Sequence, residues 1–286
     1  MPDIFFKKRN LNFATKIFIF ILLIFFFTVL SSVLVLVIGL TNNDLRAVQL
    51  IQTIGLFAMP ALFVSLTWGE SPRVFLGINR MGNAKGITVV IVLMVVLIPF
   101  INLLSDLNHH IRLPEYMSGI ARQMEKTEQD IDRLQQQLLG IRSFSMFLLN
   151  LLVVAVVPAI SEELFFRGAF IGLLRTKTGF HTAIWVTAAL FSILHFQFYG
   201  FFPRLLLGAL LGYLYLWSNS LWVPVIAHFI NNAVVVFFYY LVSNGLKLPD
   251  VDKAGTGDTW WLGLISLAIT ALLVWLAKRL LVVSRK

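Results

Sequence analysis

The sequence predicts an all-α membrane protein, a polytopic bundle of about eight transmembrane helices with both termini in the cytoplasm. Of its 286 residues, 58% are hydrophobic and 13% are charged, whereas about 25% of residues are charged in ordinary soluble proteins. The apolar residues gather in runs close to the roughly 20 residues that cross a bilayer as a helix. The alternating pattern of a membrane β-barrel is absent, so backbone polar groups must be satisfied within helices. The expected spans are residues 14–40, 47–68, 86–104, 144–174, 180–198, 203–218, 221–243 and 259–281.

Two of these runs need comment. The first follows a basic N-terminus, but at about 27 residues it is too long for the apolar region of a signal peptide, and it has no evident small-residue cleavage site. We therefore expect it to be a retained first helix. The run at 203–218 is short, and Gly208 and Gly212 within it are expected to let a neighbouring helix approach closely.

The distribution of charge predicts the orientation in the membrane. If the N-terminus is inside and the spans alternate, the inner segments hold most of the Lys and Arg residues, with only Asp3 and Glu70 as acidic residues. The outer segments then hold cations and carboxylates in nearly equal numbers. This asymmetry follows the positive-inside rule and favours the cytoplasmic membrane of a cell as the location. It also accounts for the net charge of +9 without a nucleic-acid partner, which would require Lys and Arg clustered on one surface.

The chain divides into an N-terminal three-span region (1–104), an outer amphipathic segment (105–143), a core (144–243), and an outer loop with the last span (244–286). In the outer segment, apolar residues recur every three or four positions over 117–141, which predicts an amphipathic helix. This helix is expected to lie on the outer membrane face or to pack on the bundle. A coiled-coil dimer contact through 117–141 and a lid over the site remain as alternatives.

Three charges stand inside the expected span 144–174, in the stretch "VVPAISEELFFRGAF". A charged group at the centre of a membrane helix costs roughly 2.5–3.5 kcal/mol, so such groups must be paired, hydrated or neutralised. Glu163 and Arg167 are four residues apart and can pair on one helical face. Glu162 is turned about 100° from Glu163, which leaves it free for another task. Pro158, four residues before Glu162, is expected to disturb the helix.

Two later spans also carry polar groups, in "FSILH" (Phe191 to His195) and "HFINN" (His228 to Asn232). Because polar groups within a membrane face the bundle interior or a water-filled cavity, we expect Glu162, His195, His228 and Asn232 to meet in one hydrated pocket. Straight helices would separate His195 and His228 in depth by about 12 Å unless the helix at 180–198 tilts, starts late or breaks.

Such a pocket suits hydrolysis of an amide. A carboxylate and an imidazole can remove a proton from water, and a second imidazole and a carboxamide can donate hydrogen bonds to the oxyanion. The alternative is a zinc site, with His195 and His228 as ligands together with Glu162. Each residue taken alone also fits a structural role in helix packing. The chain has no cysteine, which excludes thiol nucleophiles, disulfides and cysteine-ligated metals.

These motifs resemble those of the CAAX protease and bacteriocin-processing (CPBP) group of intramembrane proteases, also called the abortive-infection or type II CAAX prenyl endopeptidase family. "EELFFR" is similar to its EExxxR motif, "FSILH" to its FxxxH motif and "HFINN" to its HxxxN-type motif. The three stand in the family's order, and the resemblance covers about 144–243.

The resemblance implies an intramembrane endopeptidase acting on a membrane-associated protein or peptide. It implies that Glu162 activates water with help from His195, that His228 and Asn232 stabilise the oxyanion, and that Glu163 and Arg167 support the site. Family members are described both as metalloproteases, which would use Zn²⁺, and as glutamate-dependent proteases. A non-hydrolytic bacteriocin-immunity or binding protein and a proton-coupled transporter remain as other functions for such a pocket.

Overall fold

The computed structural model describes residues 11–41, 44–68, 71–111, 113–246 and 253–282. Every regular element in these ranges is a helix. The all-α prediction is confirmed. Among the residues that the structure describes, six helices are long and apolar enough to cross a membrane, or seven if the bent pair Ala84–Val96 and Ile98–His109 forms one span. They correspond to six of the eight expected spans, and the protein is a multi-pass membrane protein. The six are Phe13–Val37, Leu45–Trp68, Phe144–Thr178, Phe201–Ser218, Trp222–Ser243 and Gly257–Leu281.

Several of these long helices contain short π-helical or 3₁₀ turns. The elements in chain order are α1 (Phe13–Val37), α2 (Leu45–Thr53), η1 (Ile54–Ala58), α3 (Met59–Trp68), α4 (Pro72–Phe75), α5 (Ala84–Val96), α6 (Ile98–His109), η2 (Glu115–Met117), α7 (Ser118–Leu139), α8 (Phe144–Asn150), η3 (Leu151–Val156), α9 (Val157–Glu163), η4 (Leu164–Phe170), α10 (Ile171–Thr178), α11 (Phe180–Ile193), α12 (Phe201–Ser218), α13 (Trp222–Ser243), η6 (Gly257–Thr259) and α14 (Trp260–Leu281).

The other two expected spans differ from the prediction. The segment predicted as one helix at 86–104 consists of α5 and α6, which meet at an angle of 42°. Pro99 is the second residue of α6, and proline lacks the backbone N–H that would continue the preceding helix. The helix predicted at 180–198 is α11, and it ends after 14 residues at Ile193. The chain turns there, and Phe196 adopts a positive φ of 54°.

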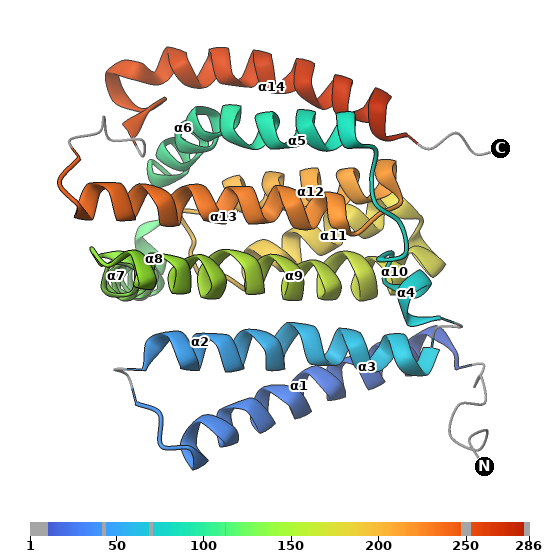
Figure 1. Ribbon diagram of the computed structural model, residues 1–286. Helices are drawn as coiled ribbons and strands as arrows, with labels where there is room; N and C mark the ends of the chain where they lie inside the picture. The colour runs from blue at the N-terminus through green and yellow to red at the C-terminus, as the bar shows by residue number, and fades with distance from the viewer. Residues whose placement is uncertain (1–10, 42–43, 69–70, 112, 247–252, 283–286) are drawn as a thin grey trace.

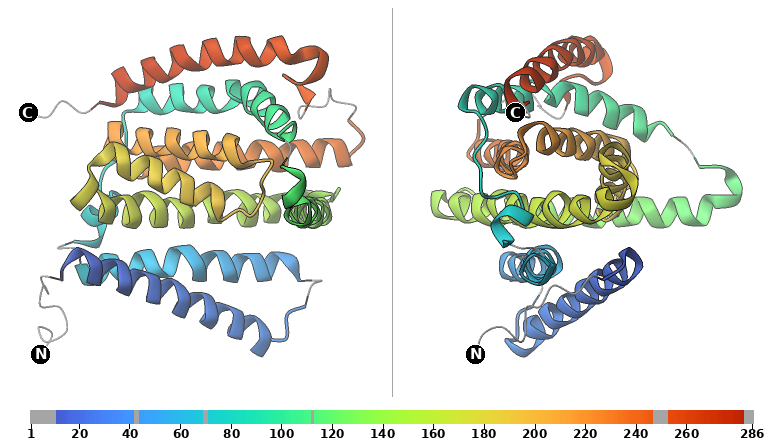
Figure 2. Two further views of the ribbon diagram at one scale, coloured as in Figure 1. Left: turned by 180° about the vertical axis from the view of Figure 1, so that it is seen from behind. Right: turned by 90° about the vertical axis from the view of Figure 1, so that its right-hand side faces the viewer.

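The helices stack in layers that run nearly side by side (Figure 1). One outer layer holds α1 with α2 and α3, and the opposite outer layer holds α14 with α5 and α6. Between them lie α12 and α13 and the long helix formed by α8, η3, α9, η4 and α10 (Figures 1 and 2). The core segment of the sequence therefore occupies the middle of the bundle.

The amphipathic helix predicted at 117–141 is present as α7 (Ser118–Leu139), and it lies across the bundle. It is seen end-on in Figure 1 and along its length in the right-hand view of Figure 2. The helix lies at the end of the bundle opposite to the start of α1 and the end of α14 (Figure 1). Its last turn is anchored by two hydrogen bonds to the carbonyl oxygen of Leu138, from Nη2 of Arg46 at 2.6 Å and from Nδ2 of Asn150 at 2.9 Å.

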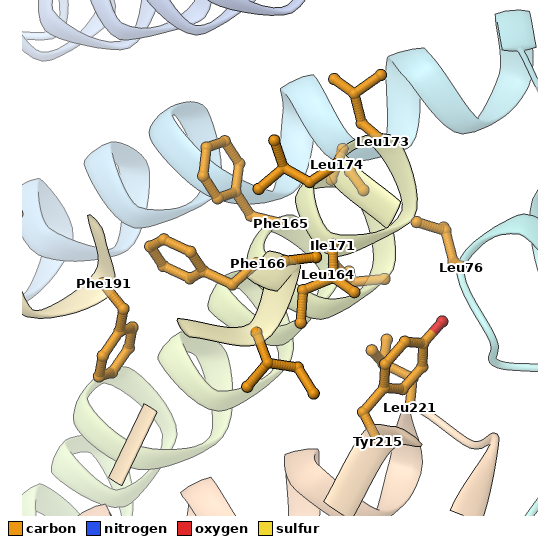
Figure 3. Packing of buried hydrophobic residues seen from close by; sticks show 14 of the residues in the cluster. Leu76, Leu164, Phe165, Phe166, Ile171, Leu173, Leu174, Phe191, Tyr215 and Leu221 are labelled. Atoms are coloured by element: carbon orange, nitrogen blue, oxygen red, sulfur yellow. The ribbon is translucent and has the colours of Figure 1, made fainter. Parts of the chain in front are cut away.

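A buried apolar cluster joins residues of the long helix to residues of α11 and α12 (Figure 3). Phe165 and Phe166 both belong to it, and the ring of Phe166 meets that of Phe191 on α11 edge-to-face, with centroids 5.2 Å apart. Edge-to-face contacts of this kind add roughly 0.5–1.5 kcal/mol to the burial of the rings. The cluster thus holds α11 against the helix that carries Glu162 and Glu163.

Candidate functional site

The two glutamates stand at the end of α9, directly before the π-helical turn η4 that carries Arg167. Nη1 of Arg167 donates to Oε1 of Glu163 at 2.6 Å, and both side chains are fully buried. Nη2 of Arg167 donates to the carbonyl oxygen of Gly208 on α12 at 2.9 Å. The expected ion pair between neighbouring turns is therefore present, and it also joins the long helix to α12.

Gly208 and Gly212 lie where α12 approaches α11 closely. A Cβ added at Gly208 would lie 3.2 Å from Cα of Ala188, and one at Gly212 would lie 2.8 Å from Cγ2 of Ile184. Both distances are shorter than ordinary van der Waals contact, which is about 3.5–4.0 Å between carbon atoms. The predicted close packing at these two glycines is confirmed, and its partner is α11.

Glu163 also contacts His228 of α13, a relationship that the sequence does not reveal. Nδ1 of His228 lies 2.9 Å from Oε1 of Glu163, the oxygen that also accepts from Arg167. Because a carboxylate accepts hydrogen bonds, Nδ1 is the donor. The other ring nitrogen, Nε2, lies 3.9 Å from Oε2 of Glu162. His228 therefore stands between the two glutamates, held by one and facing the other.

His195 follows α11 in the turn after Ile193. Its Nδ1 lies 2.7 Å from the carbonyl oxygen of Phe191, which can only accept, so Nδ1 is the protonated nitrogen. In the neutral ring Nε2 is then left as a hydrogen-bond acceptor. The ring of Phe191 lies 4.8 Å from that of His195 and 5.9 Å from that of His228 between centroids. Phe191 is thus the spacer that separates the two imidazoles.

Asn232 has a contact that follows from Pro158. Proline has no N–H to donate to the residue four positions earlier, so the carbonyl oxygen of Val154 lacks its α-helical partner. Nδ2 of Asn232 lies 3.2 Å from that oxygen, and Oδ1 of Asn232 accepts from Nδ2 of Asn231 at 3.1 Å. An amide nitrogen carries two N–H groups, so one N–H of Asn232 is used structurally and one is left.

The four residues expected in one pocket line one cavity of about 840 Å³: Glu162, His195, His228 and Asn232. Glu163 and Arg167 do not line it and lie behind its wall. The cavity contains polar groups that the sequence analysis did not single out. Those from the core are Gln197, Arg204 and Asn231, and those from α1 and α2 are Thr28, Ser31, Ser32, Gln49, Gln52 and Thr53.

The polar residues of α2 carry a signal that sequence analysis could have used. Gln49, Gln52 and Thr53 are spaced by three and four positions, so they share one helical face within an apolar span. Polar side chains in membrane helices tend to face the bundle interior or a cavity, and here the face lines the cavity across from Glu162. The N-terminal region therefore contributes a wall of the site.

The outer helix α7 contributes another wall. Ile131, Leu134, Gln135, Leu138 and Leu139 line the cavity. The helix therefore packs on the bundle through its C-terminal half, as one of the expected arrangements proposed. Its position over the cavity also agrees with the lid alternative. The structure holds a single chain, so the dimer contact through 117–141 stays a prediction.

The structure allows a test of whether these residues fit a zinc ion. In the part of the chain that the structure describes, no group of three or more His, Cys, Asp or Glu side chains is arranged to hold a metal ion. The Nδ1 contacts of His228 and His195 leave both Nε2 atoms available as donors, as in metal-ligating histidines. A three-ligand zinc site also requires a third donor that converges with them on one point. Among the described residues the donors do not converge in this way, so the set does not fit a zinc ion.

Comparison with known proteins is consistent with this site. Residues 144–234 match the family described as Rce1-like, type II CAAX prenyl endopeptidase Rce1-like. The matched residues contain all three motifs and all six candidate site residues. The core of the chain is thus similar to the type II CAAX prenyl endopeptidases. The family match leaves the first three spans, α7 and α14 uncovered.

Two relatives from Bacillus subtilis (strain 168) are similar to parts of the chain. The one named "Putative membrane peptidase YdiL" is 31% identical over 42% of this chain and 46% of its own length. The one named "Uncharacterized protein YpbD" is 33% identical over 30% of this chain and 43% of its own length. The match thus spans less than half the length of either relative. No solved structure matches the chain.

Proposed function

We propose that this protein is an intramembrane endopeptidase that hydrolyses a peptide bond of a membrane-associated protein or peptide. The observation that carries the proposal is the convergence of Glu162, His195, His228 and Asn232 on one cavity from the long helix, the turn after α11, and α13. Groups that are costly to place in a membrane need a joint reason to meet there. A hydrolytic site is the chemistry that uses all four.

In this mechanism, Glu162 and the free Nε2 of His195 act on one water molecule. Glu162 takes a proton from the water while the oxygen attacks the carbonyl carbon of the substrate. The proton then passes from Glu162 to the leaving nitrogen as the C–N bond breaks. The products are a new carboxyl group and a new amine.

The oxyanion formed by this attack needs hydrogen-bond donors. The second N–H of Asn232 is one, and the imidazolium form of His228 would supply the other from Nε2. That nitrogen lies 3.9 Å from Oε2 of Glu162, on the side of the ring that faces away from Glu163.

Glu163 and Arg167 act as positioning residues in this proposal. Glu163 fixes the ring of His228 through Nδ1, and Arg167 fixes Glu163 and joins it to α12. Their full burial keeps them away from the substrate. One carboxylate of the pair thus builds the site, and its neighbour performs the chemistry.

The membrane placement completes the proposal. Residues 144–243 form the proteolytic core, 1–104 supply the wall with Gln49 and Gln52, and 105–143 lie outside the cell. The substrate enters the cavity from a cytoplasmic membrane of the bacterial type. A peptide in an extended form would find donors and acceptors for its backbone along the polar face of α2, which a membrane interior does not otherwise provide.

The experiment compares purified wild-type protein with Glu162→Gln after incubation with a pool of membrane proteins and apolar peptides. New peptide ends are identified by mass spectrometry. Hydrolysis by the wild type that disappears in Glu162→Gln supports the proposal. The matched control is Glu125→Gln, which changes an exposed glutamate on α7 and should cleave as the wild type does. Equal cleavage by Glu162→Gln would overturn the mechanism. The absence of wild-type cleavage, with the pocket intact, would favour a binding or immunity protein.

A further inference from the structure

Arg204 stands in the first turn of α12, at the junction of two cavities. One is the 840 Å³ cavity that contains the candidate site, and the other is a cavity of about 290 Å³ bounded by α5, α6 and α13. Four residues line both: Arg204, Leu207, Asn231 and Val235. A ligand that extends from the candidate site into the smaller cavity must pass this guanidinium.

The guanidinium is held in place by a neighbouring residue. Nη1 of Arg204 donates to the backbone carbonyl oxygen of Gln197 at 3.3 Å, and Nη2 donates to the side-chain oxygen Oε1 of the same residue. Arg204 and His195 line the same cavity. A fixed cation therefore stands near the residues proposed to activate water.

No carboxylate of the described residues forms an ion pair with Arg204. Glu128 and Asp132 of α7 are the acidic residues whose charges act on it. Glu128 accepts a hydrogen bond from the backbone N–H of Tyr199 at 3.4 Å. The charge of Arg204 is thus left available to a ligand.

A purely structural role does not explain the choice of residue. Tying the turn after α11 to α12 requires a hydrogen-bond donor, and a neutral side chain would serve at lower cost within a membrane. Arginine adds a fixed charge and a planar fork of donors, which matches the two oxygens of a carboxylate. The residue type and its position in the wall point to an anionic, planar ligand.

We propose that Arg204 binds a carboxylate of the peptide whose bond is cleaved, so that the substrate carries a negative charge close to the scissile bond. This inference rests on the proposed peptidase function. The carboxylate has two sources in a peptide, the C-terminus and the side chain of Asp or Glu. In the first case the enzyme cleaves near the end of a chain, and in the second within it.

The test measures binding separately from hydrolysis, on the Glu162→Gln protein in detergent. Three pools of short N-acetylated apolar peptides are used: free acids, the same peptides as C-terminal amides, and amides that contain one Asp or Glu. Retained peptides are quantified by mass spectrometry after the protein is separated from free peptide. Retention of the acids but not the plain amides assigns Arg204 to the C-terminus. Retention of the Asp- or Glu-containing amides assigns it to a side chain.

Substitutions at Arg204 then decide whether this residue is responsible. Arg204→Gln should weaken retention of the carboxylate peptides about 10- to 100-fold, the loss expected for a charge-assisted hydrogen bond. Arg204→Lys keeps the charge without the fork and should retain an intermediate amount. The matched control is Arg133→Gln on α7, whose parent side chain is exposed and paired with Asp130 at 3.5 Å. The control should bind as the parent does.

Three results would overturn the inference: equal retention of acids and plain amides, unchanged retention in Arg204→Gln, or no retention of any carboxylate peptide. If Arg204→Gln does not fold, as judged by its thermal unfolding in detergent, the Arg204→Lys protein decides alone. Peptide binding by Arg204→Lys equal to that of the parent would then contradict a role for the planar guanidinium. Failure of the peptidase function shows differently, as absent or Glu162-independent hydrolysis by protein with an intact Glu162. The two failures are therefore distinguishable.

Discussion

His228 and Glu163 are joined by a contact of 2.9 Å between Nδ1 and Oε1, although they belong to helices 65 residues apart in the chain. Both side chains are buried, and the same carboxylate oxygen accepts from Arg167. Oε1 of Glu163 thus accepts from two side chains, Arg167 on the same long helix and His228 on α13. The site depends on this oxygen for its shape, while Glu162 next to it has no comparable partner.

The two adjacent glutamates should therefore respond differently to the same substitution. Glu163→Gln removes the charge that holds Arg167 and His228, and breaking a buried ion pair costs about 3–5 kcal/mol. We expect a large fall in the thermal unfolding midpoint in detergent together with loss of hydrolysis. Glu162→Gln should abolish hydrolysis with a much smaller change in that midpoint, because its nearest ion contact is 3.9 Å. Equal destabilisation by the two substitutions would contradict the assigned roles.

Asn232 and Pro158 should be energetically coupled. Asn232→Ala removes the side-chain donor to the carbonyl oxygen of Val154, at a cost of about 1–3 kcal/mol. Pro158→Ala supplies a backbone N–H that can take over as the helical donor to that oxygen. Asn232→Ala should therefore cost less in the Pro158→Ala background, with a coupling energy of about 1 kcal/mol. A double-mutant cycle of unfolding midpoints measures it, and additive effects would refute the link.

The close approach of α11 and α12 predicts which glycines tolerate a methyl group. Gly212→Ala places its Cβ 2.8 Å from Ile184, so the helices must separate, at a cost of about 1–3 kcal/mol. Gly172→Ala is the matched control, because this helical glycine has no atom within 4 Å of an added Cβ. The control should be neutral or stabilising, since alanine is favoured over glycine in helices by about 1 kcal/mol. Thermal unfolding in detergent separates the two, and similar midpoints would argue against the packing described.

The absence of cysteine from the chain makes the orientation directly testable. Tyr116 is 86% exposed in the segment before α7, and Met81 is 69% exposed in the loop before α5. In intact cells, Tyr116→Cys should react with a membrane-impermeant maleimide, and Met81→Cys should react only after the membrane is opened. The cysteine-free parent serves as the background control. The reverse pattern of labelling would invert the topology.

Much of the fold could be predicted from sequence because a membrane imposes simple rules. Apolar length marked the spans, and spacing of four residues marked the pair of Glu163 and Arg167. The bend between α5 and α6 was missed because apolar length alone does not register Pro99, although proline is a known helix breaker. Pro99 was therefore a signal in the sequence for a bend within the span predicted at 86–104.

Other features could not be predicted, because they depend on contacts between helices. Straight helices would place His195 and His228 about 12 Å apart in depth. The early end of α11 and the turn at Phe196 bring His195 to the same cavity instead. The contact between His228 and Glu163 likewise arises only when α13 packs on α9. The location of Arg204 between two cavities depends on how α12 packs among its neighbouring helices. Local spacing carries no information about such partners.

The central claim is that Glu162 activates water in the shared cavity, and a single-turnover experiment in oxygen-18 water tests it most directly. The wild-type protein, in excess over a cleaved peptide, is analysed by mass spectrometry after one turnover. The account predicts one heavy oxygen in the new carboxyl group of the product and none in the side chain of Glu162. Label in Glu162, with none in the first product, would show that the carboxylate attacks the substrate itself and would contradict the mechanism.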